Sequence, residues 1–481
     1  MSNKNKTFLF ISDPFDMATG VAGQSLMLAL ALRERGYRCL NLAAYPAEVP
    51  VDRLPYRFLD DEGKWQVANV KFPTFEHLLD GRAVAMIPCS GFGDPRRIPL
   101  IIDAIKRHTG DQVEIVMVTD PRFYRPFWPT ANALRTLGVK IHYWHVWDNG
   151  PTPLFNKYLG DVVDSLCCIS RTTQLGLEQA VDDKSKVFYL PHGLDERGPF
   201  VPIVETDQQR HALRAKWFGK SYSNKLVVFW DNKNFWRKMP GQLLFAFSLA
   251  IKDDPNLLLV MKTSPYPQSG EIGQDLVTMA TNLGLVIGEN VVFVDKEVSF
   301  PELNEMYNAV DVTINISHSE GFGLSTLCSM FAGTPIIAVA TGGLRDQLEV
   351  PTVYEPGGIE LLDGVVPCTS GQGWVIWPAN RNITGSPPAP YIYEEHTSFN
   401  AVRAAIVIAA KTLRDSGPLH RIRAREFALK NFNLKDVVDK FISCVEREIA
   451  PYSGKQISFS MPLQAKENKM VRGIIDAKNE Q

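Results

Sequence analysis

Short apolar runs alternate with longer helical patterns along almost the whole chain. This alternation is typical of βαβ units, in which helices cover a sheet of parallel strands. In the first half the expected strands are 7–12, 38–43, 83–88, 113–118, 140–146, 165–169 and 186–190. In the second half they are 226–230, 257–261, 291–294, 312–316 and 335–339. The sequence therefore predicts an α/β protein with two doubly wound, Rossmann-like domains that face each other across a cleft.

The alternation of strand and helix patterns is interrupted by a proline-rich stretch and is lost near residue 450. These two places set the expected domain boundaries. We expect a first domain over 1–195, a linker over 196–215 and a second domain over 216–430. A helix within 431–450 and a polar tail over 451–481 complete the chain. The stretch 378–398 is rich in Pro, Asn and Ser, and it is expected to be a loop.

Composition excludes several classes of protein. The chain has 481 residues, with 51 Lys and Arg against 53 Asp and Glu, so a strongly basic binder of polyanions is excluded. No apolar run approaches the roughly 20 residues that span a bilayer, and the first apolar run is too short for a signal peptide. The seven Cys are scattered without a C-x-x-C pair, so neither a zinc ribbon nor a disulfide framework is indicated. We expect a cytoplasmic enzyme without a membrane span.

The most informative stretch is 311–349, where a buried strand is followed by Glu320-Gly321-Phe322-Gly323 and a helix that starts near Leu324. Glycines let the backbone approach a ligand closely, and the helix N-terminus offers amides to an anion. A neighbouring carboxylate accepts hydrogen bonds from sugar hydroxyls. The alternative is a tight strand-to-helix turn whose glycines serve sterics alone.

This stretch resembles the donor-site signature of retaining glycosyltransferases of family 4, which have the two-Rossmann GT-B fold. Glu320–Leu324, Gly333-Thr334-Pro335 and Gly342-Gly343-Leu344 carry the resemblance. It implies that Glu320 contacts the donor sugar as a catalytic residue. It also implies that Gly321, Phe322, Gly323 and Leu324 lie against the sugar and diphosphate of a nucleotide diphospho-sugar. A UDP-sugar is the favoured donor, as a co-substrate, and no other cofactor is expected.

Position 328 departs from the family pattern. The family normally carries a second glutamate eight positions after the first, in contact with the nucleotide's ribose, and Cys328 stands there in this chain. A thiol is a poor hydrogen-bond acceptor, so ribose recognition is weaker or comes from elsewhere. Cys328 is most simply a small packing residue within the nucleotide site. Because of Cys328, a protein that binds nucleotide sugars without catalysis remains an alternative.

Cations are expected at the donor diphosphate. In the resembled family the loop corresponding to 231–238 supplies an Arg and a Lys, and here Lys238 is favoured first, Lys233 second and Arg237 third. Two cations after a strand neutralise a diphosphate as it leaves, when its negative charge develops. Gly20 belongs to a stretch that resembles the family's first glycine loop near the donor phosphate. A charged, solvated loop is the alternative.

The acceptor side is expected at the ends of two strands of the first domain. Asp148 and His145 fall at or just past the end of strand 140–146, and either would orient the acceptor hydroxyl or stabilise an oxocarbenium-like centre. Aromatic and basic side chains nearby would stack on a sugar or base, bind phosphate or pack in the core; they are Arg122, Tyr124, Arg125 and Trp147.

Transfer without a metal is expected, because no D-x-D pair is present to hold a divalent ion on the diphosphate and His/Cys ligand spacing is missing. The unusual first half and Cys328 suggest a divergent viral or phage member, which would act in the host cytoplasm. A DNA-modifying sugar transferase acting on a hydroxymethylated base is therefore an alternative, with nucleic acid as a partner. A further alternative is an unrelated α/β enzyme or interaction protein. In the resembled fold the C-terminal helix crosses back onto the first domain. The sequence leaves the oligomeric state open.

Overall fold

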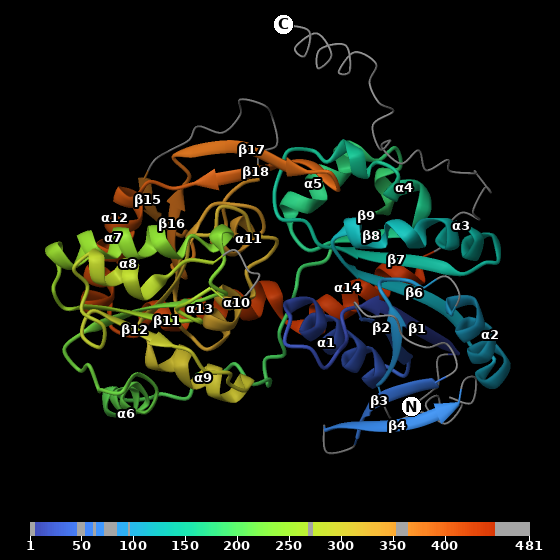
Figure 1. Cartoon of the computed structure of the whole chain (residues 1–481), viewed down its shortest axis with the longest axis horizontal. Helices are drawn as coiled ribbons and strands as arrows, with labels where there is room; N and C mark the ends of the chain where they lie inside the picture. Colours follow the sequence, from blue (N-terminus) through green and yellow to red (C-terminus); the bar gives the residue numbers. More distant parts are fainter. Residues whose placement is uncertain are drawn as a thin grey trace, which may run out of the picture.

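The computed structural model describes residues 5–45, 53–60, 64–71, 84–94, 97–267, 273–352 and 364–447. The described chain folds into two α/β halves that lie side by side (Figure 1). Each half is built on one sheet whose faces are covered by helices. The tail expected over 451–481 lies outside the described residues.

The first sheet has nine strands in the order β4-β3-β5-β2-β1-β6-β7-β8-β9. All neighbours from β5 to β9 pair in parallel, whereas β3 pairs antiparallel with both β4 and β5. The strands are β1 (Lys6–Ser12), β2 (Arg38–Tyr45), β3 (Arg53–Leu59), β4 (Trp65–Lys71), β5 (Ala85–Ser90), β6 (Gln112–Thr119), β7 (Lys140–His145), β8 (Ser165–Cys168) and β9 (Val187–Tyr189).

The second sheet has seven strands in the order β12-β11-β10-β13-β14-β16-β15, parallel except for β15. A separate hairpin, β17–β18, follows it in the chain. These strands are β10 (Leu226–Asp231), β11 (Leu257–Lys262), β12 (Val291–Val294), β13 (Val312–Asn315), β14 (Ile336–Val339), β15 (Gly364–Pro367), β16 (Gly373–Trp377), β17 (Asn380–Ser386) and β18 (Ala389–His396).

Helices lie between the strands, as the alternating pattern predicts, and three more follow at the C-terminal end of the described chain. They are α1 (Gly20–Glu34), α2 (Ile98–Thr109), α3 (Trp128–Thr136), α4 (Leu159–Val162), α5 (Arg171–Ala180), α6 (Asp207–Phe218), α7 (Pro240–Asp253), α8 (Leu276–Asn282), α9 (Phe300–Ala309), α10 (Leu324–Phe331), α11 (Leu344–Leu348), α12 (Phe399–Ser416), α13 (Leu419–Phe432) and α14 (Leu434–Glu446). Within the described residues, none is long and apolar enough to cross a membrane.

Strand order reverses once in each sheet, between β1 and β6 in the first and between β10 and β13 in the second. Loops that leave neighbouring strands at such a switch point diverge to opposite faces and open a crevice at the carboxyl edge. The prediction of two doubly wound domains is confirmed, and the site is to be sought where these two crevices face each other.

Two expectations about irregular segments are wrong. The stretch 378–398 forms the β17–β18 hairpin, because Pro387 and Pro388 confine the turn and leave alternating Tyr391 and Tyr393 free to pair. The expected linker 196–215 contains most of α6, which begins at a capping box on Thr206 and packs on α9 of the second half.

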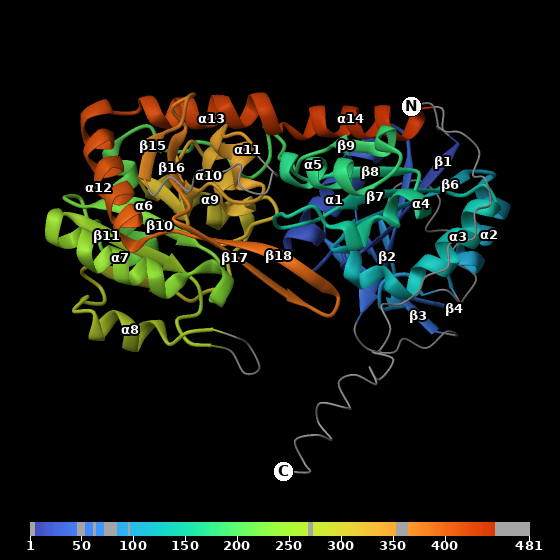
Figure 2. The same cartoon turned by 90° about the horizontal axis from the view of Figure 1, so that it is seen from above.

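The C-terminal helices α13 and α14 run across both halves of the molecule (Figure 2). Helix α14 packs on α1 and β8 of the first half. Its Phe441 is fully buried and meets Phe8 of β1 edge-on, with ring centroids 5.7 Å apart. Helix α14 thus packs on the half that contains β1 and α1.

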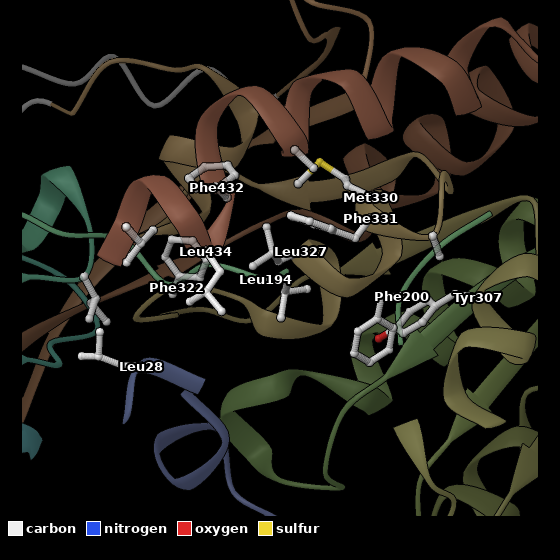
Figure 3. Close-up of a cluster of buried hydrophobic side chains, with 14 of the residues drawn as sticks. Leu28, Leu194, Phe200, Tyr307, Phe322, Leu327, Met330, Phe331, Phe432 and Leu434 are labelled. Carbon is white, nitrogen blue, oxygen red and sulfur yellow. The ribbon is translucent and has the colours of Figure 1, made fainter. Parts of the chain in front are cut away.

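One hydrophobic cluster joins the two halves behind the crevices (Figure 3). Leu28 comes from α1, Leu194 from the crossing between the halves, and Phe432 and Leu434 from the junction of α13 and α14. Phe322, from the turn before α10, lies among them and is 3% exposed. Because apolar burial favours contact over separation, this cluster holds the two carboxyl edges face to face.

Candidate functional site

Three loops meet at the boundary between the halves. Helix α1 begins at Gly20, and a Cβ atom added there would lie 2.7 Å from Cδ1 of Leu324, the first residue of α10. A Cβ atom on Gly321 would lie 2.9 Å from Oδ1 of Asp148. Only glycine permits approaches this close. The structure therefore brings Gly20, Gly321 and Asp148 into one narrow site.

Four charged side chains converge there. Lys238, at the end of the loop after β10, forms an ion pair with Glu320. Arg237 lies 3.7 Å from Asp148 and 3.8 Å from Glu320, and its guanidinium donates to the carbonyl of Ser319. Three loops thus contribute to one cluster with alternating charges. It unites four of the residues expected at the donor and acceptor sides.

The protonation states follow from burial and charge. Burial alone would raise the pKa of Glu320, but Lys238, Arg237 and the hydroxyl of Ser317 lower it below its ordinary value. Burial lowers the pKa of Lys238, and Glu320 opposes that effect. Burial also opposes the charged form of Arg237, but Asp148 and Glu320 raise its pKa. We therefore treat Glu320 as an ionised carboxylate held between two cations.

The two-glycine turn after β14 packs directly under the Glu320 loop. Gly342 has a φ of +46°, and a Cβ atom there would lie 2.1 Å from the carbonyl oxygen of Asp148. The amide of Gly343 donates to the carbonyl of Glu320 at 2.8 Å. Side chains at either position would push the two domains' loops apart, so the turn fixes how closely Asp148 and Glu320 approach.

A polar cavity of about 430 Å³ is lined in part by the loop after β10, which also carries Arg237 and Lys238, and it reaches both halves. Its wall is formed by the loops after β10, β11 and β12, together with Ala18 before α1. Among the described residues, two buried atoms in its wall find no hydrogen-bond partner: Nδ2 of Asn232 and Oγ1 of Thr263. Buried polar groups are normally paired, so these two atoms are exceptions in the wall of the cavity. The lining residues are Ala18, Asp231, Asn232, Lys233, Asn234, Lys262, Thr263, Ser264, Tyr266, Val294, Asp295, Lys296 and Glu297.

Two residues expected at the donor lie elsewhere or act differently. The side chain of Phe322 points into the hydrophobic cluster, where its ring meets those of His192 and Phe432 at 5.2 and 5.4 Å. It therefore offers a ligand backbone groups only. Burial raises the pKa of the Cys328 thiol, and the charge of Asp231 adds to this. Cys328 is thus a protonated, partly buried thiol on α10 beside the cavity residue Asp231.

Three residues expected at the acceptor or in catalysis are core residues. The ring of His145 is fully buried, and burial lowers its pKa to about 3, so it is a neutral imidazole without contact to solvent. Tyr124 is fully buried, and its hydroxyl donates to the carbonyl of Val118 at 3.0 Å. Trp147 is 4% exposed. Neighbours distant in sequence cover these three side chains, so they pack in the core.

Arg122 and Arg125 are exposed, but each has a partner. Arg122 lies 3.1 Å from Asp120 and over the ring of Phe123, whereas Arg125 donates to the carbonyl of Pro388 in the hairpin at 3.0 Å. Tyr124 and Trp147 are both buried, so neither offers a ring face on which a base or sugar could stack.

Asp120 is a site residue that sequence reasoning missed. It follows β6 directly, so the same rule that selected Asp148 after β7 would have selected it. Burial, with a smaller effect from the charge of Asp148, raises its pKa to about 6 against the opposing charge of Arg122. Two neighbouring carboxylates thus stand at the acceptor-side edge, one of them titrating near neutral pH.

The sequence comparisons match part of the second half. Residues 215–350 match the family model described as glycosyl transferases group 1. The D-inositol 3-phosphate glycosyltransferase of Thermomonospora curvata is 36% identical over 112 residues, which are 22% of this chain and 25% of that protein. The chain therefore matches about a quarter of that curated relative's length.

Solved structures match the chain over almost its whole length. Anabaena HepE in complex with UDP and glucose aligns with a TM-score of 0.57 at 15% identity, over 91% of this chain and 99% of that one. Sucrose-phosphate synthase from Thermosynechococcus elongatus aligns with a TM-score of 0.58 at 15% identity, over 92% and 98%. At this identity the likeness shows the fold, and the fold is GT-B.

Asp120 gives a prediction for stability against pH. Its pKa is 3.8 without the protein environment and about 6 in the folded chain, so the folded state binds an extra proton between these values. Stability from this group therefore increases as the pH falls through about 6. The unfolding free energy of the wild type should increase from about pH 7.5 to about pH 5 through this group. In Asp120→Asn the increase should be smaller by about 1 kcal/mol.

Urea unfolding at the two pH values measures this difference. Asp103→Asn is the matched control, since Asp103 is an exposed aspartate on α2 with a side chain 64% exposed. Equal gains in wild type and Asp120→Asn would show that Asp120 does not titrate in this range.

Proposed function

We propose that this chain is a metal-independent, retaining glycosyltransferase of family 4, which moves a sugar from a nucleotide diphospho-sugar to an acceptor hydroxyl. The observation that carries the proposal is the cluster of Glu320, Lys238, Arg237 and Asp148, which shares the loop after β10 with the polar cavity. The GT-B fold and the match of 215–350 to group 1 glycosyl transferases support it. A cytoplasmic location fits a chain whose donor would be a nucleotide sugar.

The nucleoside is proposed to occupy the cavity. Asn232 and Thr263 provide an unpaired donor and an unpaired hydroxyl in its wall, and Lys233 reaches it from the loop after β10. A UDP-sugar is the proposed donor, since Anabaena HepE was solved with UDP and with UDP-glucose. No glutamate faces the ribose at position 328, and Cys328 is a protonated thiol, so polar groups of the cavity wall must bind the ribose instead.

The diphosphate is proposed to lie between Lys238, Arg237 and the start of α10. That helix begins at Leu324 after Gly323, which has a φ of +93°, and the side chain of Leu324 lies against Gly20 of the first half. As the bond to the sugar breaks, negative charge develops on the diphosphate, and fixed cations and amides stabilise it most at that moment. Glu320, ionised between the same cations, accepts hydrogen bonds from the sugar hydroxyls.

Asp148 is proposed to face the reacting carbon from the first domain. Its side chain is about one-third exposed, at 34%, and lies near Arg237. A retaining route in which the acceptor attacks from the leaving-group side needs orientation more than a strong base. Asp148, with Asp120 beside it, would orient the acceptor hydroxyl. We propose a small polyhydroxyl acceptor such as a sugar phosphate, with Arg122 the exposed cation on that side.

A thermal-shift panel of UDP-, GDP-, ADP- and CMP-sugars tests the donor site. At about a hundredfold excess over the dissociation constant, binding to the folded state adds about 2.7 kcal/mol of stability. We expect a shift with UDP-sugars that EDTA leaves unchanged. The absence of a shift with every nucleotide sugar would contradict the proposed function, and loss of the shift in EDTA would contradict metal independence.

Lys238→Ala tests the diphosphate site. A hydrogen bond to a charged group is worth about 1.5–3 kcal/mol, so donor affinity should fall about 10- to 100-fold. Titration calorimetry with the nucleotide sugar identified by the panel measures the loss. Lys252→Ala, an exposed lysine on α7, is the control and should bind as the wild type does. Unchanged affinity in Lys238→Ala would refute its contact with the diphosphate.

Glu320→Ala is expected to abolish release of the nucleotide diphosphate, because it removes the carboxylate that holds the sugar. A wild-type chain that binds the donor but never turns it over would instead support the non-catalytic alternative.

The stereochemistry of the product tests the retaining mechanism. Proton NMR of an early product should show the same anomeric configuration as the donor, because attack and departure share one face. An inverted anomeric centre would contradict the proposed route, while it would leave the donor site in place.

A further inference from the structure

The β17–β18 hairpin begins and ends in the second half, and its tip lies against the first half (Figure 2). Its Tyr391 hydroxyl donates to the carbonyl of Thr152 and accepts from the amide of Leu154, both at 3.1 Å. The ring of Tyr391 also meets Phe155 edge-on at 4.9 Å. The hairpin therefore binds the loop after β7, which carries Asp148.

Asn149 follows Asp148 directly, and it links the hairpin to the site. Its side chain is buried at 4% exposure. Its amide nitrogen lies within hydrogen-bond distance of three acceptors: Oγ1 of Thr341 at 3.0 Å, Oε2 of Glu395 at 3.1 Å and the carbonyl of Tyr393 at 3.3 Å. All three belong to the second half. The amide nitrogen of a first-domain side chain thus donates to the domain proposed to bind the donor.

Glu395 is a partner of Asn149 in the second half. Its carboxylate is 1% exposed and pairs with Arg345 of α11 and Arg381 of β17. Its backbone amide donates to the carbonyl of His318 at 2.7 Å, two residues before Glu320. A buried carboxylate needs such cations to remain charged. Glu395 therefore connects the hairpin, the loop that carries Glu320 and, through Asn149, the loop that carries Asp148.

We propose that Glu395 and Asn149 are positioning residues that hold Asp148 in register with Glu320 across the domain boundary. The proposal rests on the proposed function, because it gives a role to that register at the reacting sugar carbon. Neither residue touches the substrate. Their effect is on the geometry of turnover rather than on donor affinity, since neither Asn149 nor Glu395 lines the cavity.

An exchange of amide and carboxylate tests this connection. Asn149→Asp places two carboxylates against each other, and repulsion should displace the Asp148 loop. A misplacement of roughly 1 Å lowers turnover about 100-fold, so kcat for hydrolysis of UDP-glucose without acceptor should fall by about that factor. KM should change less than about threefold. The double variant Asn149→Asp/Glu395→Gln again places a hydrogen-bond donor against an acceptor. Its kcat should be at least about tenfold higher than that of Asn149→Asp.

The control is Ile383→Ala, which shortens a hairpin side chain that is 64% exposed and should keep wild-type kcat and KM. Wild-type kcat in Asn149→Asp would overturn the proposal, and so would a double variant no more active than the single one. If the wild type neither binds nor hydrolyses UDP-glucose, the proposed donor fails, and hydrogen exchange then decides the inference.

Hydrogen exchange in the ligand-free chain is independent of the donor. The amide of Leu154 bonds the hairpin, and the amide of Glu395 bonds His318, so both report on the connection. Both should exchange faster in Asn149→Asp and return towards the wild-type rate in the double variant. Unchanged exchange at both amides would show that Asn149 and Glu395 do not couple the two loops, whatever the donor.

Discussion

Contact between two carboxyl sheet edges is the constraint on which the rest of this structure depends. Each doubly wound half forms only part of a site, and the hydrophobic cluster around Phe322 keeps the halves facing each other. Phe322 lies between Glu320 and α10 in sequence, so the same turn that carries the carboxylate also anchors it to the interdomain core. Burial of the Phe322 ring thus helps to fix the position of Glu320.

Close packing of backbone against backbone then brings opposite charges together. Gly321, Gly342 and Gly343 allow the Glu320 loop to approach Asp148 to distances that a side chain would prevent. At that separation Arg237 lies near both carboxylates, and Lys238 pairs with Glu320. Charges fixed in this way before a ligand arrives need no reorganisation during a reaction, which is the condition under which they stabilise a transition state most.

Much of this follows from sequence because it depends on short-range pattern. The alternation of strands and helices predicts both sheets, and the position of Glu320 between a buried strand and a helix predicts a strand-end site. The depth of a side chain is harder to predict. His145, Tyr124 and Trp147 follow the same rule as Asp148, yet they pack in the core, because burial depends on neighbours distant in sequence. The hairpin was missed since its pairing is masked by Pro, Asn and Ser.

A crystal structure of the chain with UDP-glucose tests the central claim most directly. The account predicts the uridine in the cavity beside Asn232 and Thr263, the diphosphate on Lys238 and the start of α10, and the glucose between Glu320 and Asp148. A nucleotide bound away from this cavity, or a sugar turned away from Glu320, would contradict the account.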